Sequence, residues 1–337
     1  MSDKLVTKPK PKNMRRSDYD VTNNVNVTSA ESVCLSVREI FDSLFGPGKF
    51  SAIEKGFEDF DKLFEGEFDG YQACDTFYHD KQHTLDMTLA LARLIEGYQQ
   101  LHSKQDQLSL EFARIGLICA LYHDSGYIRQ TDDSACNGSV YTKTHVSRSA
   151  IFLARYLPMI GLEDYVDIAR NIVHYTGYEI KPTDIVLHDK KLHTIGYMLG
   201  SADLIAQMSD RCYLEKCRDR LYPEFVLGEV AEMPQDDGST RLLYTSGNHL
   251  LEKTPGFYQH EINGRLNHLF NGVYQYAKQH FGDSNHYIDA LEANMSHLDS
   301  LISENNLHTL SRIPLVNNGT LFVNTANSEA IKRLKIK

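Results

Sequence analysis

Apolar side chains recur every third or fourth position along most of the chain. The stretch "SAESVCLSVREIFDSLF" shows this spacing, and it begins at Ser29, a residue type that often caps helix N-termini. The same period continues through residues 51–65, 83–101, 108–122, 144–159, 163–175, 189–213, 257–281 and 285–304. Because few segments alternate with the period of a strand, the pattern predicts an all-α fold.

Two regions interrupt this helical pattern. Residues 125–142 are rich in Ser, Asp, Asn and Gly, and residues 222–256 contain three prolines and "DDG". Both compositions are typical of loops. In the second region "TRLLYTS" fits a short hairpin arm, and a long loop beside a site often acts as a lid. The sequence therefore predicts one helical domain over 29–313, a flexible basic tail over 1–28 and an irregular tail over 314–337.

Composition narrows the class of protein. The chain has 337 residues, 42% of them hydrophobic, and a formal net charge of −10, which disfavours nucleic acid or an anionic membrane as a partner. No apolar run approaches the ~18 residues of a membrane span, and the polar N-terminus lacks the apolar core of a secretory signal. We therefore expect a cytoplasmic protein. The six cysteines contain no C-x-x-C pair, so neither a disulfide framework nor a thiolate zinc site is indicated.

His–Asp dipeptides occur at 79–80, 123–124 and 188–189, and their contexts differ. His123 and Asp124 end the apolar run "RIGLICALYHDSGY", where burial of an ionisable pair is costly unless another charge compensates for it. Asp189 instead precedes the helical pattern "KKLHTIGYMLGSADL" and is predicted to be its N-cap. We therefore expect a functional role for His123 and Asp124, and a structural one for Asp189.

Further histidines and carboxylates lie on predicted helices with apolar faces. His83 follows His79 by four residues, so the two imidazoles share one helix face. A bundle that joins such faces would collect His83, His123, Asp124, His145, His174 and Asp203. Each histidine alone is more simply explained as an ordinary core or surface residue. Together they predict a metal centre, because imidazole suits Fe, Mn, Co, Ni or Zn and a carboxylate such as Asp124 can bridge two ions.

The order H…HD…H…H…D resembles the HD-domain superfamily of metal-dependent phosphohydrolases, over about residues 70–215. The resemblance implies an HD-domain helical bundle, here with extra N- and C-terminal helices, and two divalent transition-metal ions, with Mg also compatible with the second position. It assigns His83, His123, Asp124 and Asp203 to one ion, and Asp124, His145 and His174 to the other.

The opening "YHDKQH" is similar to the Y-H-N-x-x-H motif of class I cyclic-nucleotide phosphodiesterases. The similarity implies that His79 is a general acid and that His83 is a metal ligand. Asp80 stands where those enzymes have asparagine, and we expect it either to support a protonated His79 or to face solvent. Tyr127 stands where the cyclic-di-nucleotide branch commonly has lysine, which disfavours that branch.

These features predict a metal-dependent phosphodiesterase that hydrolyses a nucleotide or cyclic-nucleotide phosphate ester. His79 and the bridging Asp124 are the expected catalytic residues. The expected substrate cations are Lys81, Lys143, Arg148 and Arg211. Phe257 could stack on a base, although ordinary packing explains it more simply. The expected partner is a small-molecule phosphate ester, with neither membrane nor nucleic acid. The sequence leaves the oligomeric state open, a homodimer included.

Two other functions remain open at this point. A few HD-domain proteins that resemble myo-inositol oxygenase use the same ligand order in a di-iron oxygenase, which here would act on a polyol or phosphonate. A non-catalytic HD module that senses a nucleotide is the other alternative. The sequence alone does not separate these functions from hydrolysis.

Overall fold

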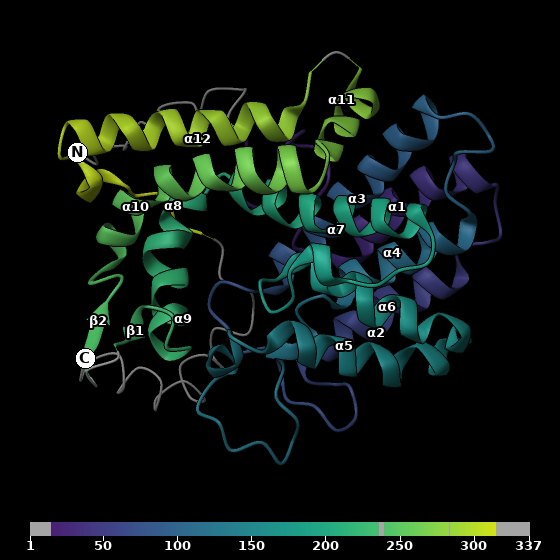
Figure 1. The fold of residues 1–337 in the computed structure, drawn as a ribbon, viewed down its shortest axis with the longest axis horizontal. Coiled ribbons are helices and arrows are strands. Elements are labelled where there is room, and N and C mark those ends of the chain that lie inside the picture. Colours follow the sequence, from purple (N-terminus) through teal and green to yellow (C-terminus); the bar gives the residue numbers. More distant parts are fainter. Residues whose placement is uncertain (1–14, 236–238, 283, 315–337) are drawn as a thin grey trace, which may run out of the picture.

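The computed structural model describes residues 15–235, 239–282 and 284–314. Within these residues the fold is helical apart from one antiparallel pair of short strands, which confirms the all-α prediction (Figure 1). The α-helices are α1 (Ala30–Phe45), α2 (Ser51–Glu65), α3 (Lys81–Leu101), α4 (Leu110–Tyr122), α5 (His145–Tyr156), α6 (Val166–Ile172), α7 (Lys190–Ser209), α8 (Tyr213–Lys216), α9 (Tyr222–Leu227), α10 (Gly247–His260), α11 (Tyr276–Phe281) and α12 (His286–Ser303). None of these helices is long and apolar enough to span a membrane.

Shorter elements connect these helices. The 3₁₀ turns are η1 (Ser125–Tyr127), η2 (Gly138–Tyr141), η3 (Leu157–Ile160), η4 (Glu163–Tyr165), η5 (Val173–Thr176), η6 (Pro182–Asp184), η9 (Val273–Gln275) and η10 (Leu307–Thr309). Two segments have π-helical pairing, η7 (Cys217–Leu221) and η8 (Glu261–Leu269). The strands are β1 (Glu232–Pro234) and β2 (Thr240–Leu242), with Glu232 opposite Leu242.

The centre of the fold is α3, which is buried along nearly its whole length and packs against α1, α4, α7 and α11. A helix that is covered on all sides needs apolar residues around its full circumference, and α3 supplies them with "TLALARLI". Its one buried guanidinium, Arg93, donates to Asp20 at 2.6 Å and to the Tyr287 hydroxyl at 2.8 Å. This pairing fixes the N-terminal segment to α3 and α12.

Side-chain caps set several helix starts. The Ser29 hydroxyl accepts from the Ser32 amide at the start of α1, and Asp189 accepts from the Lys191 amide at the start of α7. Both predicted caps are therefore confirmed. Asp80 accepts from the His83 amide at 3.0 Å and so caps α3 immediately beside the candidate site.

A second, smaller core lies toward the C-terminal half. It gathers Leu214, Leu251 and Leu298 from α8, α10 and α12 with further apolar residues around them. Figure 1 places α8, α9, α10 and the two strands at one end of the molecule, away from α1, α2 and α4. The fold therefore has a main bundle and a C-terminal end that meets it near α7.

The structure corrects two sequence predictions. Residues 222–256 are not one loop, because they contain α9, the hairpin and the start of α10; β2 confirms the predicted arm. Prolines misled the prediction, since α9 continues from the π-helical η7 through Pro223, and α10 continues through Pro255. Residues 15–28 also pack on the helices, with Val27 and Asp20 buried, while 1–14 and 315–337 lie outside the described residues.

Glycine at one position in α3 allows a close helix contact, which makes a testable prediction. A Cβ at Gly97 would lie 1.9 Å from the Tyr276 carbonyl oxygen of α11. Gly97→Ala should therefore lower stability by about 1–3 kcal/mol, because α11 must shift. Gly256→Ala is the matched control, since that Cβ meets nothing within 4 Å and gains helix propensity. Thermal unfolding followed by circular dichroism measures both; equal midpoints for the two variants would contradict the contact.

Candidate metal centre

Three helices bring four of the predicted ligands together. His83 lies in the first turn of α3, His123 ends α4 and is followed by Asp124, and Asp203 lies within α7. All four side chains are buried. The close packing of α3 with α4 and α7 is what places them on a common interior face.

The distances describe a compact cluster. The His83 Nε2 atom lies 3.2 Å from Asp203 Oδ1 and 3.5 Å from Asp124 Oδ2. The His123 Nε2 atom lies 3.2 Å from Asp124 Oδ2 and 3.8 Å from Asp203 Oδ1. The ligand atoms of His83, His123 and Asp203 all fall within 4.8 Å of one another. Two nitrogens and two carboxylates at this spacing could hold one metal ion.

The orientation of His123 supports this interpretation. Its Nδ1 lies 2.8 Å from the Ala120 carbonyl oxygen, so Nδ1 carries the proton and donates, which leaves the Nε2 lone pair facing the cluster. Buried His123 Nε2 and Asp124 Oδ2 lie 3.2 Å apart, yet among the described residues neither makes a hydrogen bond of acceptable geometry. Buried polar atoms are nearly always paired, so a bound cation accounts for both atoms at once.

His145 faces the other carboxylate oxygen of Asp124. Its Nδ1 lies 2.8 Å from the Thr142 carbonyl oxygen, and its Nε2 lies 3.7 Å from Asp124 Oδ1. Asp124 therefore faces His83 and His123 with one oxygen and His145 with the other, as a bridging carboxylate would. A glycine permits this arrangement, since a Cβ at Gly126 would lie 1.8 Å from the His145 carbonyl oxygen.

His174 is the predicted ligand that the structure does not join to the rest. It is buried on η5, and its Nδ1 has no hydrogen-bond partner within the part of the chain that is described. Short nitrogen–oxygen distances link the five other predicted ligands, and none of these pairs includes His174. The structure thus assembles the ligands of the first ion, and only Asp124 and His145 of the second set.

Charge pairing shapes the protonation of the cluster. Burial alone would lower the pKa of His123, but the adjacent Asp124 carboxylate outweighs burial and raises that pKa to about 9. Burial would raise the pKa of Asp124, yet His123 and His79 hold it well below its usual range. Burial lowers the pKa of His145 and of His174. The Asp124 carboxylate therefore favours positive charge beside it, whereas burial favours the neutral form of His145 and His174.

His79, the predicted general acid, is held by a carboxylate that sequence reasoning missed. Glu224 of α9 is fully buried, and its Oε2 accepts from His79 Nδ1 at 2.6 Å while its Oε1 accepts from the Tyr78 amide at 2.6 Å. The Tyr127 ring stacks on His79 with centroids 4.5 Å apart. Burial would lower the pKa of His79, but Glu224 and then Asp124 outweigh it and raise the pKa to about 9.

Asp80 does not take the role that its sequence position suggested. Besides capping α3, it pairs with Arg220 at 3.1 Å, so it neither supports His79 directly nor faces solvent. Glu224 escaped detection because it follows Pro223 in a segment predicted to be a loop. The only sequence signal was a carboxylate beside two aromatic residues, which is too common to select.

The cluster opens into a cavity of about 530 Å³. His79, Asp124, His145 and Asp203 line one end of it, with Tyr127 beside them. Lys143 also lines this cavity, as predicted for a substrate cation. The candidate metal ligands, the candidate proton donor His79 and Lys143 therefore face a common cavity that is large enough for a small molecule.

The other predicted substrate cations are engaged elsewhere. Lys81 pairs with Asp61 and Glu65 of α2, because the first turn of α3 faces that helix. The Arg148 guanidinium donates to the Gly126 carbonyl oxygen at 2.6 Å and lies over the Tyr141 ring, so it holds the loop after Asp124. Arg211 donates to the Arg15 carbonyl oxygen and so holds the N-terminal segment. None of the three is among the residues that line the cavity.

The metal site makes a direct prediction about metal content. Protein purified without added metal should retain a transition metal, and His123→Ala should lower the retained amount by about tenfold or more, because a buried ligand is lost. His188→Ala is the matched control, since His188 belongs to a similar His–Asp dipeptide but is exposed. Mass spectrometry of the metals, with circular dichroism to check folding, measures the difference. Equal metal in both variants would contradict the assignment.

Comparisons with known proteins leave the site to be interpreted from its own residues. No protein-family model, no curated protein and no solved structure matches this chain. The resemblance to HD-domain phosphohydrolases therefore stays a prediction. What the structure supplies independently is a helical fold with a buried His/Asp cluster that could hold a metal.

Proposed function

We propose that this protein is a metal-dependent hydrolase of phosphoric esters, acting as a phosphodiesterase. One observation supports this best: the His83/His123/Asp124/Asp203 cluster and the His79–Glu224 pair line or adjoin the same cavity. A metal cluster without a proton donor would fit many reactions. The pair adds the group that departure of an alcohol requires.

The donor set fits divalent transition metals such as Fe, Mn, Co, Ni or Zn. His83, His123, Asp124 and Asp203 would hold one ion, and Asp124 with His145 would contribute to a second, with His174 as its remaining candidate ligand. Bound ions of this kind neutralise phosphoryl charge and make water a better nucleophile at neutral pH. His123 Nε2 and Asp124 Oδ2, which make no hydrogen bond among the described residues, support a cation at this place.

His79 would protonate the leaving oxygen. Hydrolysis breaks the bond between phosphorus and that oxygen; water supplies the oxygen that joins phosphorus and loses one proton to solvent. The alkoxide leaves far more easily with a proton, which a positioned imidazolium can give. Glu224 orients the ring through Nδ1, so Nε2 is the nitrogen left for substrate. The Tyr127 ring packs against both His79 and His145, with centroids 4.5 and 4.4 Å away, and limits rotation of both rings.

Lys143 would contact the phosphoryl oxygens. It lies at the start of the segment that carries His145, lines the cavity and is exposed to it. An ammonium at this place supplies positive charge beyond the metals and can form charge-assisted hydrogen bonds to phosphate. The nearby Glu179 is already occupied, because its carboxylate accepts from the Val146 and Ser147 amides and caps α5.

The proton-donor role predicts a dependence on the leaving group. His79→Ala should reduce kcat by about 10²–10⁴-fold for diesters with an alkyl leaving group. The same variant should lose far less with p-nitrophenyl leaving groups, since p-nitrophenolate departs without a proton. Steady-state kinetics with the metal-loaded protein on both ester types measures the two ratios, and KM should change little.

Glu224→Gln tests the positioning of His79. It keeps the size of the side chain but removes its charge, so it should show the same leaving-group pattern as His79→Ala with a smaller loss. His188→Ala should leave both ester types unaffected. Equal losses on alkyl and p-nitrophenyl esters would show that His79 is not the proton donor, and absence of all hydrolysis after metal loading would reject the proposed function.

A further inference from the structure

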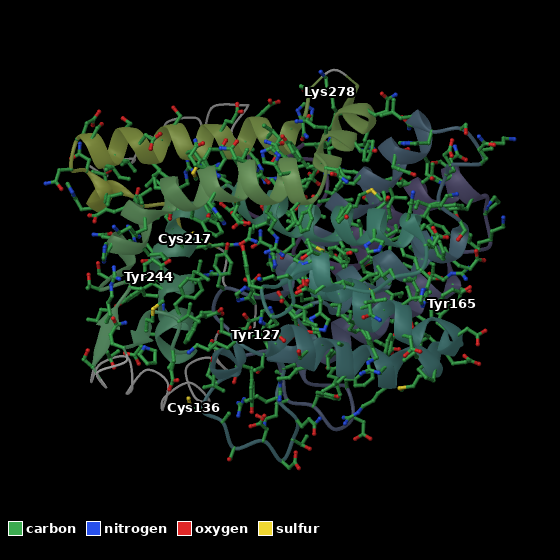
Figure 2. All side chains as sticks on the ribbon, viewed as in Figure 1. Tyr127, Cys136, Tyr165, Cys217, Tyr244 and Lys278 are labelled. Atoms are coloured by element: carbon green, nitrogen blue, oxygen red, sulfur yellow. The ribbon has the colours of Figure 1, made fainter. Side chains whose placement is uncertain are left out.

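The cavity continues well beyond the metal ligands. From the His79 end it extends to the C-terminal part of the fold, where η7, α9, α10 and the segments next to the two strands form its far end. Figure 2 shows Cys217 and Tyr244 on this C-terminal side and Tyr127 nearer the middle of the molecule. A phosphate group alone needs only the first part of such a space.

Apolar side chains line most of the far end of the cavity. Its side chains include Leu221, Phe225, Val230, Tyr244, Leu250 and Phe257. The Phe225 and Tyr244 rings pack with centroids 5.8 Å apart and form an aromatic wall. Phe257, the one aromatic residue of "GFYQ" that lines the cavity, is 42% exposed, so much of its ring remains available to a ligand in the cavity.

The polar groups at this end are few: the Thr254 hydroxyl, the Tyr244 hydroxyl and the Lys253 ammonium lie among mostly apolar lining residues. The Thr254 hydroxyl is already engaged, because it donates to the Leu250 carbonyl oxygen at 3.0 Å. A nucleoside placed here would bring sugar hydroxyls and base edges that lose water and find few partners, which lowers affinity. An alkyl or aryl group loses no hydrogen bond and gains roughly threefold in affinity for each buried methylene.

We infer that the substrate carries an apolar alcohol group, alkyl or aryl, which binds at the far end of the cavity against Phe225, Tyr244 and Phe257. The inference rests on the proposed function for the position of the phosphate at the metal cluster. It competes with the nucleotide prediction from the sequence resemblance. The cavity joins both parts, so one molecule can place its phosphate by Lys143 and its apolar group between α9 and α10.

Alkylphosphonates test the inference by binding alone, because their C–P bond is not an ester and is not hydrolysed. Titration calorimetry of the Mn²⁺-loaded protein would compare methyl-, butyl- and hexylphosphonate with nucleoside monophosphates. Affinity should rise roughly 200-fold from methyl to hexyl, since each of the five added methylenes leaves water for an apolar wall. The nucleotides should bind more weakly than hexylphosphonate.

Variants at Phe257 test where the alkyl chain binds. Phe257→Ala should reduce the ratio of hexyl to methyl affinity, and Phe257→Leu should restore most of it, because leucine also covers the chain. Phe257 is partly exposed, so its replacement should leave the fold intact. Leu101→Ala is the control, as Leu101 is also an exposed apolar residue but lies at the end of α3, outside the cavity lining.

The outcomes distinguish failure of the apolar-substrate inference from failure of the proposed hydrolase function. Equal affinity along the alkyl series, or tighter binding of nucleotides than of hexylphosphonate, would overturn the apolar substrate and leave the hydrolase proposal standing. An unchanged hexyl-to-methyl ratio in Phe257→Ala would overturn the assigned position. Failure of every phosphonate and nucleotide to bind the metal-loaded protein would reject the phosphate site itself, and the proposed function with it.

Discussion

The burial of charge at the junction of α3, α4 and α7 is the constraint on which the site depends. Asp124 is 2% exposed, and the ring nitrogen of His123 that faces it has no other partner among the described residues. Charged and polar groups in such surroundings lose hydration and must be compensated. Histidines on three elements and a second carboxylate supply part of that compensation, and a metal ion would supply the rest. Main-chain acceptors behind His123 and His145 fix which nitrogen faces inward.

A second buried carboxylate ties the C-terminal part of the fold to this centre. Glu224 reaches from α9 to the His79 ring and to the Tyr78 amide, so the segment that forms the far end of the cavity also orients the proposed proton donor. The proposed substrate pocket and the proposed proton donor are therefore linked through one short helix, α9. The π-helical segment η7, which directly precedes α9, supplies Cys217 and Leu221 to the same cavity. π-helical turns are often found at functional sites, and here the turn lies next to the proposed substrate pocket.

The sequence predicted the fold class, most helix positions and the central cluster, for a physical reason: polar residues on apolar helix faces are conspicuous. His83, His123, Asp124 and Asp203 were found in this way. Spacing could not tell that no hydrogen bond or ion pair would join His174 to the cluster among the described residues, because this depends on how η5 packs. Exposed cations were poorly predicted, since Lys81, Arg148 and Arg211 have the same local pattern as Lys143 but pair with other elements. Glu224 was missed because the prolines of residues 222–256 led us to predict a loop where α9 lies.

Crystals of protein purified without added metal, measured on either side of the absorption edges of the candidate metals, would test the central claim most directly. The account predicts an anomalous peak among His83 Nε2, His123 Nε2, Asp124 and Asp203 Oδ1, and its edge would identify the element. A second peak beside Asp124 Oδ1 and His145 would establish the dinuclear form. A well-ordered site with no peak there, even after soaking with Mn²⁺ or Zn²⁺, would contradict the metal centre and the hydrolase proposal that depends on it.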